Sequence, residues 1–437
     1  MCSVAEDIEE LPHSCSAESK RFMKESLQKC KKCKEKSVIL LQKKDPFCKS
    51  CFFEYCNHKF RSTIGKAKMI KHEDRVLIAF SGGRKSTALL NFTRQTLESA
   101  SLKQIRFIPG ILFIDDSMVF SSGDREAEKK EVYAALETLK SFDYPVIYSS
   151  LDMVYRLNEN KDFYWPLEEF SEEDCFCFKS RKWMEECFTN VPLSSKIDLI
   201  KHLRLLLMTE IAGHSGYSSL FTGDTASSLA VELLSDIALG RGSQICLDTS
   251  FYDSRHDVPI YRPLREFLNK EIALYNHFNG YPYEVSHGFL SQSNLKSSLQ
   301  QLTETFISNL QENYPATVFT IFRTGSKLFK NLIRVCNEAC WVCRSKMDNL
   351  DPNICSAIEA LKVSERLSTN QMVSDSEFKN GELTNVLCHG CSISFRHIAA
   401  EPSILSVLPE HGCVKMEREE MKEEIECFLL KDDDNCS

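Results

Sequence analysis

The segment that most constrains the fold is "VLIAFSGGRKSTALLNF" (residues 76–92), where an apolar run, two glycines and a helical pattern follow one another without interruption. The apolar run predicts a buried strand, and the apolar spacing after Ser86 and Thr87 predicts a helix. Gly82 and Gly83 permit a tight turn that points successive backbone amides at one anion, beside the positive end of the helix dipole. The segment therefore predicts an α/β fold with a phosphate-binding turn, and the alternative is a tight turn that binds no ligand.

Strand and helix patterns alternate through the rest of the central region. Further strands are predicted at 108–116, 144–150 and 217–224, separated by helical patterns. Such alternation predicts a doubly wound parallel sheet, which binds ligands at the carboxyl ends of its strands. The candidate phosphate or nucleotide residues at those ends are Ser81, Gly82, Gly83, Lys85, Ser86, Thr87, Asp115, Gly223 and Asp224.

The first cysteine cluster lies near the N-terminus. It has the spacing C-x2-C-x14-C-x2-C and comprises Cys30, Cys33, Cys48 and Cys51. Each C-x-x-C turn can present two thiolates to one metal, and a hairpin between the turns would complete the tetrahedral four-sulfur site that zinc prefers in structural positions. The spacing predicts structural zinc, and a redox pair or unliganded thiols are the alternatives. The neighbouring Cys56 falls within a helical apolar stripe and is predicted to lie in the core.

A second cysteine cluster lies towards the other end of the chain. It pairs Cys340 with Cys343 and Cys388 with Cys391, and 44 residues separate the two pairs. A long loop between ligand pairs costs little, because closure entropy grows only logarithmically with loop length. We therefore expect a second four-sulfur zinc site, with two unrelated turns as the alternative, and a mobile insertion at about 352–385.

Charge is distributed unevenly along the 437 residues, although the net charge is -8. The segment 20–71 holds 16 Lys and Arg against 4 Asp and Glu, whereas 414–437 holds 4 against 9. A basic segment on an acidic protein suits contact with nucleic-acid phosphates, and a solvated lysine-rich helix is the alternative.

The composition also bears on the cellular compartment. No apolar run is long enough to span a membrane, and the first residues lack the basic and apolar regions of a signal peptide. A cytoplasmic location without a membrane partner is therefore expected. Because the cytosol keeps thiols reduced, the clustered cysteines among the 20 in the chain are expected to bind metal rather than to form disulfides.

Together these motifs carry a resemblance to a known family. The order S-G-G-x-x-S/T, "FIDDS", "LFTGDTASSLAVELL" and "IYRPLREFLNKEIALY" resembles the PP-loop ATP pyrophosphatases that modify tRNA. The N-terminal cysteine pattern and the pairs "CWVC" and "LCHGC" are similar to those of the second-subunit family of the cytosolic complex that 2-thiolates the tRNA wobble uridine. The resemblance covers nearly the whole chain, and it implies an adenine nucleotide alpha-hydrolase-like fold with a cysteine-pair zinc module at each end.

The resemblance also implies a function. A chain of this family would form a heterodimer with a catalytic PP-loop thiolase subunit, which adenylates the wobble uridine and transfers sulfur from a thiocarboxylated ubiquitin-related carrier. The product would be 5-methoxycarbonylmethyl-2-thiouridine in the tRNAs for lysine, glutamate and glutamine. This chain would be a tRNA-binding subunit of that complex.

The loop departs from the catalytic pattern of the family. The family sequence S-G-G-x-D-S has an acidic fifth position, which is Lys85 here. The mid-domain C-x-x-C is replaced by Cys175 and Cys177, one residue apart, and the later cysteine before R-P-L is missing. We therefore expect a degenerate site without catalytic residues, in which these two cysteines are remnants and ATP could bind but is not expected to turn over. The alternatives are a self-sufficient ATP-dependent tRNA sulfurtransferase and a zinc-bearing adaptor that binds no nucleotide.

Basic residues in two regions are candidates for contact with tRNA phosphates, and solvated surface positions are the alternative for those in the second region. The candidates are Lys29, Lys31, Lys32 and Lys34 near the N-terminus, and Lys179, Arg181, Lys182, Arg262 and Arg265 in the central domain.

The patterns also divide the chain into regions. They are a flexible N-terminus (1–25), a zinc module with a basic helix (26–71), the PP-loop α/β domain (72–285), a helical and zinc-knuckle region (286–398) and an acidic C-terminal segment (399–437).

Overall fold

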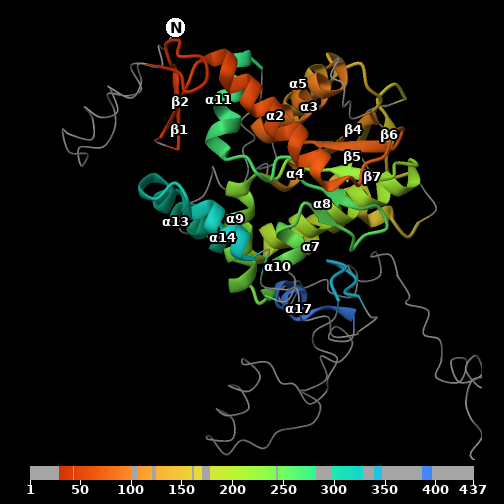
Figure 1. Ribbon diagram of the computed structural model, residues 1–437. Helices are drawn as coiled ribbons and strands as arrows, with labels where there is room; N and C mark the ends of the chain where they lie inside the picture. The colour runs from red at the N-terminus through yellow and green to blue at the C-terminus, as the bar shows by residue number, and fades with distance from the viewer. Residues whose placement is uncertain are drawn as a thin grey trace, which may run out of the picture.

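A seven-stranded sheet forms the centre of the molecule (Figure 1). The computed structural model describes residues 29–42, 44–99, 106–120, 125–159, 162–169, 178–242, 245–281, 298–325, 327, 339–346 and 386–395. The strands are β3 (Arg75–Phe80), β4 (Ile108–Asp115), β5 (Val146–Ser150), β6 (Trp165–Pro166), β7 (Ser219–Phe221), β8 (Tyr252–Asp253) and β9 (Ile260–Tyr261). Their order in the sheet is β6-β5-β4-β3-β7-β9-β8.

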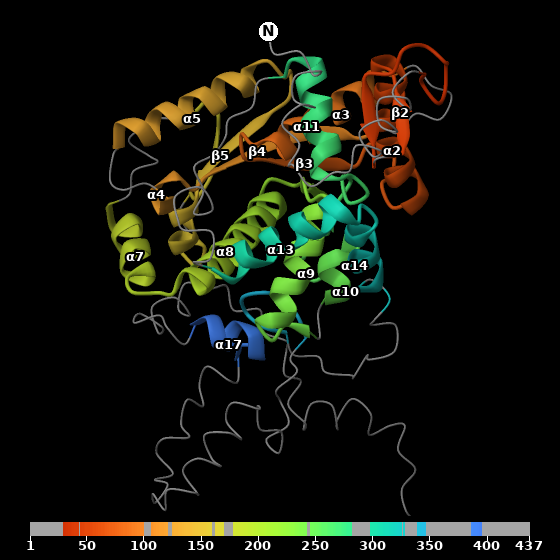
Figure 2. The same cartoon turned by 90° about the vertical axis from the view of Figure 1, so that its left-hand side faces the viewer.

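The inner strands are parallel, and the two edge strands are antiparallel to their neighbours. The helices of the domain are α3 (Arg84–Glu98), α4 (Ser117–Phe120), α5 (Arg125–Lys140), η2 (Leu151–Arg156), α7 (Phe178–Phe188), α8 (Leu193–His214), α9 (Ala226–Ala238), α10 (Ile245–Thr249) and α11 (Asn269–Asn279). Figure 2 shows α3, α5 and α11 on one side of the sheet and α8 and α9 on the other. The doubly wound α/β class is confirmed. The antiparallel edges were not predicted, and β8 runs this way because a short loop returns the chain directly to β9.

Both faces of the sheet are buried, and β3 lies at its centre. Val76, Leu77 and Ile78 are fully buried, as expected for a parallel strand that helices cover on both sides. On one side, Phe92 of α3 stacks on Tyr275 of α11 with ring centroids 4.0 Å apart. This packing holds α3 in place, and with it the loop that precedes the helix.

The N-terminal module is a hairpin followed by a long helix. Its elements are β1 (Ile39–Leu41), β2 (Asp45–Phe47) and α2 (Lys49–Ala67). The buried face of α2 comprises Cys51, Phe52, Cys56, Phe60 and Ile64, which confirms the predicted stripe and places Cys56 in the core. Lys59 of α2 forms an ion pair with the buried Glu271 of α11 (Nζ to Oε2, 2.9 Å). This contact ties the module to the central domain.

The described C-terminal helices pack on α8 and α9, the helices on one side of the sheet. They are α13 (Leu299–Asn313), α14 (Thr317–Gly325) and α17 (His389–Phe395). The first two pack on α9 around Ile307, Val318 and Phe322, whereas α17 contacts α8 (Figure 1). No described helix is long and apolar enough to span a membrane. The predicted flexible terminus 1–25, insertion 352–385 and acidic segment 399–437 lie outside the described residues.

Gly110 of β4 provides a test of the packing. A Cβ atom there would lie 2.0 Å from the Tyr217 hydroxyl oxygen, so we predict that Gly110→Ala lowers the free energy of unfolding by about 1–3 kcal/mol through overpacking. Gly65→Ala is the matched control, because no atom lies within 4 Å of a Cβ at that exposed position of α2. Alanine favours a helix, so this control should raise stability by about 0.5–1 kcal/mol. Urea denaturation measures both, and equal effects would contradict the packing.

Candidate functional site

The phosphate loop joins β3 to α3. Gly82 has a φ angle of 73°, which glycine adopts without strain. The Ser86 hydroxyl donates a hydrogen bond to the Gly83 carbonyl oxygen (3.0 Å) and accepts one from the Ser81 amide (3.2 Å). These bonds close the loop over the N-terminus of α3, where backbone amides without helical partners could bind an anion.

Two further predicted residues support the same turn. Gly223 follows β7 and packs against the first turn of α3, because a Cβ atom there would lie 3.4 Å from the backbone carbonyl carbon of Lys85. Thr87 is buried in that turn. The loop is thus enclosed by the neighbouring strand end and by its own helix.

Asp115 ends β4 beside the loop. Its carboxylate accepts hydrogen bonds from the Ser117 amide (2.9 Å) and the Tyr148 hydroxyl (3.3 Å). Burial and the nearby charge of Asp116 outweigh these bonds and raise the pKa of Asp115 to about 6. Asp115 is therefore a carboxyl group that titrates close to neutral pH at the edge of the loop.

The other two carboxylates at this edge are paired with arginines. Asp116 forms an ion pair with Arg204 of α8. Asp224 lies at the carboxyl end of β7, and its Oδ2 is 3.5 Å from Nε of Arg262. Both carboxylates therefore have a cationic partner from the protein, which competes with the magnesium ion that usually accompanies nucleotide phosphates.

Positive charge replaces the acidic position of the family pattern. Arg84 and Lys85 are both exposed in the first turn of α3. Asn276 of α11 donates a hydrogen bond to the Arg84 carbonyl oxygen (2.8 Å), which fixes the backbone of this turn. The arrangement suits an anion better than a metal cation. The two predicted remnants, Cys175 and Cys177, lie outside the described residues.

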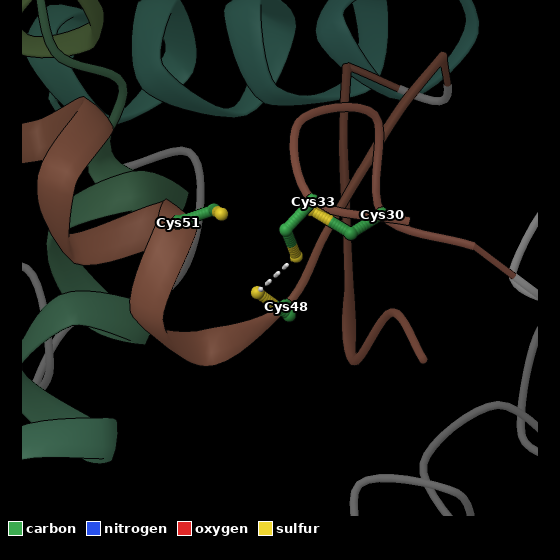
Figure 3. A group of neighbouring side chains, drawn as sticks. All are labelled: Cys30, Cys33, Cys48 and Cys51. Carbon is green, nitrogen blue, oxygen red and sulfur yellow. Dashed lines mark hydrogen bonds between the residues drawn. The ribbon is translucent and has the colours of Figure 1, made fainter. Parts of the chain in front are cut away.

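Figure 3 shows the first cysteine quartet, which we call the N-terminal quartet: Cys30, Cys33, Cys48 and Cys51. Their sulfur atoms all lie within 4.8 Å of one another, and those of Cys33 and Cys48 are 3.5 Å apart. One pair precedes β1 and the other lies at the start of α2, so the β1–β2 hairpin brings the pairs together. Cys33 is exposed and the other three are buried.

The second cluster, which we call the C-terminal quartet, comprises Cys340, Cys343, Cys388 and Cys391. All four are buried, and their sulfur atoms also lie within 4.8 Å of one another. The sulfur atoms of Cys343 and Cys388 are 3.6 Å apart. The Arg344 amide closes the first turn by donating a hydrogen bond to the Cys340 carbonyl oxygen (2.9 Å). Pairs that are distant in the sequence thus meet at one point.

Without a bound cation, the four thiols of the C-terminal quartet do not all ionise together, because their pKa values are shifted in opposite directions. Hydrogen bonds from Cys340 and its neighbours lower the pKa of Cys343, whereas the corresponding contacts raise the pKa of Cys388. Burial raises the pKa of Cys391. Each thiolate disfavours the next because like charges repel at this separation.

The geometry of both quartets fits a metal ion with four sulfur ligands. Metal–sulfur bonds of about 2.3 Å in a tetrahedron separate the sulfur atoms by about 3.8 Å, close to the 3.5 Å and 3.6 Å observed for one pair in each quartet. Four protein ligands leave no open position for a substrate, so such a centre is structural rather than catalytic.

Comparison with known proteins identifies the family. A model of the family described as cytoplasmic tRNA 2-thiolation protein 2 matches residues 298–393. Cytoplasmic tRNA 2-thiolation protein 2-A of Xenopus laevis is 31% identical over 93% of this chain and 95% of its own length. The protein of the same family in Danio rerio is 30% identical over 99% of this chain and all of its own length (100%). The chain belongs to this family.

The PP-loop fold is likewise confirmed. The U34-tRNA thiolase NcsA from Methanococcus maripaludis, solved with its 4Fe-4S cluster, has a similar fold with a TM-score of 0.51 at 16% sequence identity. The likeness covers 76% of this chain and 93% of that chain. The match to the tRNA 2-thiolation protein 2 family model spans α13, α14 and the C-terminal quartet, and therefore lies beyond the phosphate loop.

The cationic residues proposed from the sequence fall in different environments. Arg181 is half-buried, whereas six of the other candidates are exposed, namely Lys29, Lys31, Lys32, Lys34, Lys179 and Lys182. Arg265 is also half-buried and lies over the Phe322 ring, 4.8 Å from its centroid. Arg262 is only 6% exposed and lies 3.3 Å from Asp253. The assignment of Arg262 as a surface contact is therefore corrected, because its guanidinium belongs to an internal network of ion pairs.

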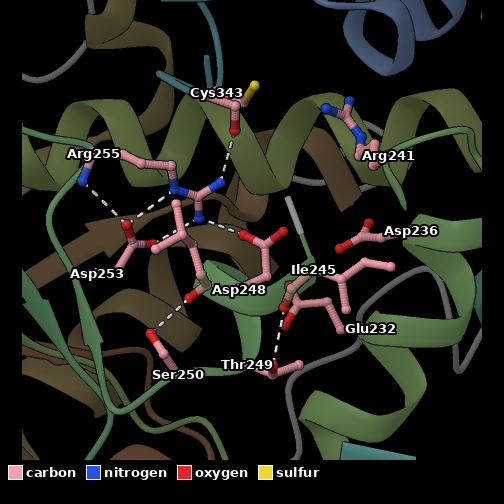
Figure 4. Close-up of polar contacts among 12 residues, drawn as sticks. Glu232, Asp236, Arg241, Ile245, Asp248, Thr249, Ser250, Asp253, Arg255 and Cys343 are labelled. Carbon is pink, nitrogen blue, oxygen red and sulfur yellow. Dashed lines mark hydrogen bonds and ion pairs between the residues drawn. The ribbon is translucent and has the colours of Figure 1, made fainter. Parts of the chain in front are cut away.

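Sequence reasoning missed that network, which Figure 4 shows in part. Arg255 lies between Asp248 and Asp253 and forms ion pairs with both. Its Nη1 donates a hydrogen bond to the Ser345 hydroxyl (2.9 Å), two residues beyond the candidate metal ligand Cys343. The network thus extends from Ser345, beside the C-terminal quartet, through Arg255 and Asp253 to Arg262, which pairs with Asp224 near the phosphate loop. No local sequence motif identifies its members.

Asp115 generates a prediction about pH. Its pKa is raised in the folded chain, so ionisation between about pH 4 and pH 7 destabilises wild type relative to its unfolded state. Asp115→Asn keeps an oxygen for the Ser117 amide and does not ionise. We predict that the unfolding free energy of the variant, minus that of wild type, rises by about 2 kcal/mol across this range. Urea denaturation at several pH values measures it, and a difference independent of pH would refute the environment described for Asp115.

Proposed function

We propose that the chain is a largely non-catalytic subunit of the cytoplasmic complex that 2-thiolates the wobble uridine of tRNA, paired with a catalytic PP-loop subunit. Membership of the cytoplasmic tRNA 2-thiolation protein 2 family supports a role in tRNA 2-thiolation and a location in the cytoplasm. The observation that carries the subunit's role is the loop itself, which keeps the anion-binding turn but presents Arg84 and Lys85 instead of an acidic residue.

The loop residues would bind rather than react. The first backbone amides of α3, beside the Gly83 turn, would donate hydrogen bonds to a phosphate. Hydrogen bonds between Ser81 and Ser86 hold the turn closed. Lys85 would add attraction for the anion. Because Asp116 and Asp224 are paired with arginines, this edge offers little support for the magnesium-dependent activation of a nucleotide. We therefore propose that ATP can bind here and is not turned over.

Both quartets are proposed to hold zinc. The residues that would bind it are Cys30, Cys33, Cys48 and Cys51 in one centre and Cys340, Cys343, Cys388 and Cys391 in the other. Bound zinc neutralises clustered thiolates and thereby stabilises the local fold.

The N-terminal module is proposed to contact tRNA by charge. The exposed pairs that Lys31 forms with Asp45 (2.7 Å) and Lys32 with Glu54 (3.6 Å) contribute little stability. Both lysines can therefore exchange a surface carboxylate for a nucleic-acid phosphate. Lys179, Arg181 and Lys182 at the start of α7 are further candidates for contact with tRNA, and Arg265, which lies over the Phe322 ring of α14, is a separate one. The ubiquitin-related sulfur carrier would act through the catalytic partner.

The test of the function is a thiolation assay with tRNA, ATP and the thiocarboxylated carrier. The purified chain, a catalytic PP-loop partner and their mixture are compared, with thiouridine measured by gel retardation. We expect ATP turnover and thiolation to require the partner, and the mixture to exceed either protein alone. Thiolation by the chain alone would establish the competing hypothesis of a self-sufficient sulfurtransferase.

The tRNA proposal has its own test. The double variant Lys29→Glu/Lys34→Glu should raise the dissociation constant for tRNA at least about tenfold and reduce its salt dependence, because phosphate contacts are lost. Lys130→Glu/Lys140→Glu on α5, away from the N-terminal module in Figure 2, reverses the same number of charges and serves as the control. Filter binding at several salt concentrations measures both. Equal losses in the two variants would assign binding to overall charge instead.

A further inference from the structure

A buried arginine of the central domain, Arg241, contacts a sulfur atom of the C-terminal quartet. Arg241 lies in the turn after α9, and its side chain is 5% exposed. Its Nη1 donates a hydrogen bond to Sγ of Cys391 (3.1 Å), and its Nη2 donates one to Oδ2 of Asp198 in α8 (2.5 Å). A single guanidinium therefore joins a candidate metal ligand to the helix beneath the sheet.

Asp198 accepts hydrogen bonds from both Arg241 and α17, and so forms a second connection between them. The Ser394 hydroxyl of α17 donates a hydrogen bond to the same Asp198 oxygen (2.6 Å), and His202 Nε2 lies 3.4 Å from the other oxygen. Although burial opposes ionisation, Arg241 and His202 hold the pKa of Asp198 well below its usual range. The buried carboxylate thus remains charged and orients both Arg241 and α17.

Two glycines make the close approach of Arg241 possible. A Cβ atom at Gly390, between the ligands Cys388 and Cys391, would lie 2.4 Å from Cγ of Arg241. Gly240, which precedes the arginine, has a φ of +81°, and a Cβ atom there would lie 3.1 Å from Cδ2 of His389. The glycine of the second cysteine pair therefore leaves room for the arginine side chain as well as for the metal-binding turn.

We propose that Arg241 is a positioning residue for the C-terminal metal centre. Four thiolates around a divalent cation leave a net negative charge, and a charge-assisted hydrogen bond to Cys391 offsets part of it in a buried setting. Partners of this kind orient metal ligands and commonly change metal retention by about 10–100-fold. The inference rests on the proposed occupancy of the quartets, and it assigns Arg241 no part in the thiolation reaction.

The test begins with the full-length chain loaded with two zinc ions. Release to a chromogenic chelator is followed for wild type, Arg241→Met and Arg241→Lys. We expect Arg241→Met to release one of the two ions about 10–100-fold faster and the other at the wild-type rate. Arg241→Lys, which keeps one charged donor, should lie between. Arg94→Met is the control, because it removes a half-buried arginine of α3 that lies over the Phe142 ring, and both of its rates should match wild type.

Cobalt substitution distinguishes charge compensation from simple packing. The sulfur-to-cobalt charge-transfer band of one centre should shift in Arg241→Met, because the hydrogen bond to Cys391 is lost, and should return towards wild type in Arg241→Lys. If Arg241→Met does not fold, Asp198→Asn removes the anchor of the arginine and should accelerate release of the same ion.

The experiments distinguish a failure of the role of Arg241 from a failure of metal binding by the quartet. Wild-type release rates and an unshifted band in folded Arg241→Met would overturn the role of Arg241 while leaving the metal assignment intact. A wild-type chain whose C-terminal quartet binds no metal ion would overturn the assignment of metal to that quartet and this inference together.

Discussion

Four thiolates held within 4.8 Å of one another repel each other unless a cation lies among them, and both cysteine modules depend on this constraint. The N-terminal hairpin has two strands of 3 residues each, too little for a stable sheet of its own. The described C-terminal segments 339–346 and 386–395 meet through their quartet and rest on α8 through Asp198 and Arg241. Under the proposed occupancy, a metal ion in each quartet would hold the cysteine pairs of that module together. The modules contact the central domain through α2 and α17.

The central domain, by contrast, is stabilised by ordinary packing. The buried strand β3 and the stacked rings of Phe92 and Tyr275 fix the start of α3 without help from a ligand. A chain can therefore keep the shape of a phosphate loop after its chemistry has changed. Here Lys85 occupies the acidic position, and arginines pair with Asp116 and Asp224. The proposed role as a partner of a catalytic subunit follows from this combination of a preserved turn and altered charges.

The sequence predicted the features that depend on residues close together in the chain. The apolar run, the glycine pair and the cysteine spacings each specify short segments, and the parallel order of the strands then places Asp115 and Gly223 beside the loop. Contacts between distant residues carry no such signal. Arg241 and Cys391 are 150 positions apart, and Arg241 and Asp198 are 43 apart. Arg262 was wrongly predicted to contact tRNA for the same reason, because the sequence does not indicate that its guanidinium is buried and paired with Asp253 and Asp224.

We propose that a four-thiolate metal centre holds together each of the two cysteine modules that pack on the PP-loop domain. The most direct test is metal analysis of the purified full-length protein combined with X-ray absorption spectroscopy. The account predicts two zinc ions per chain, each with four sulfur ligands at about 2.3 Å. An iron–sulfur cluster, nitrogen or oxygen ligands in place of sulfur, or a quartet without metal would contradict it.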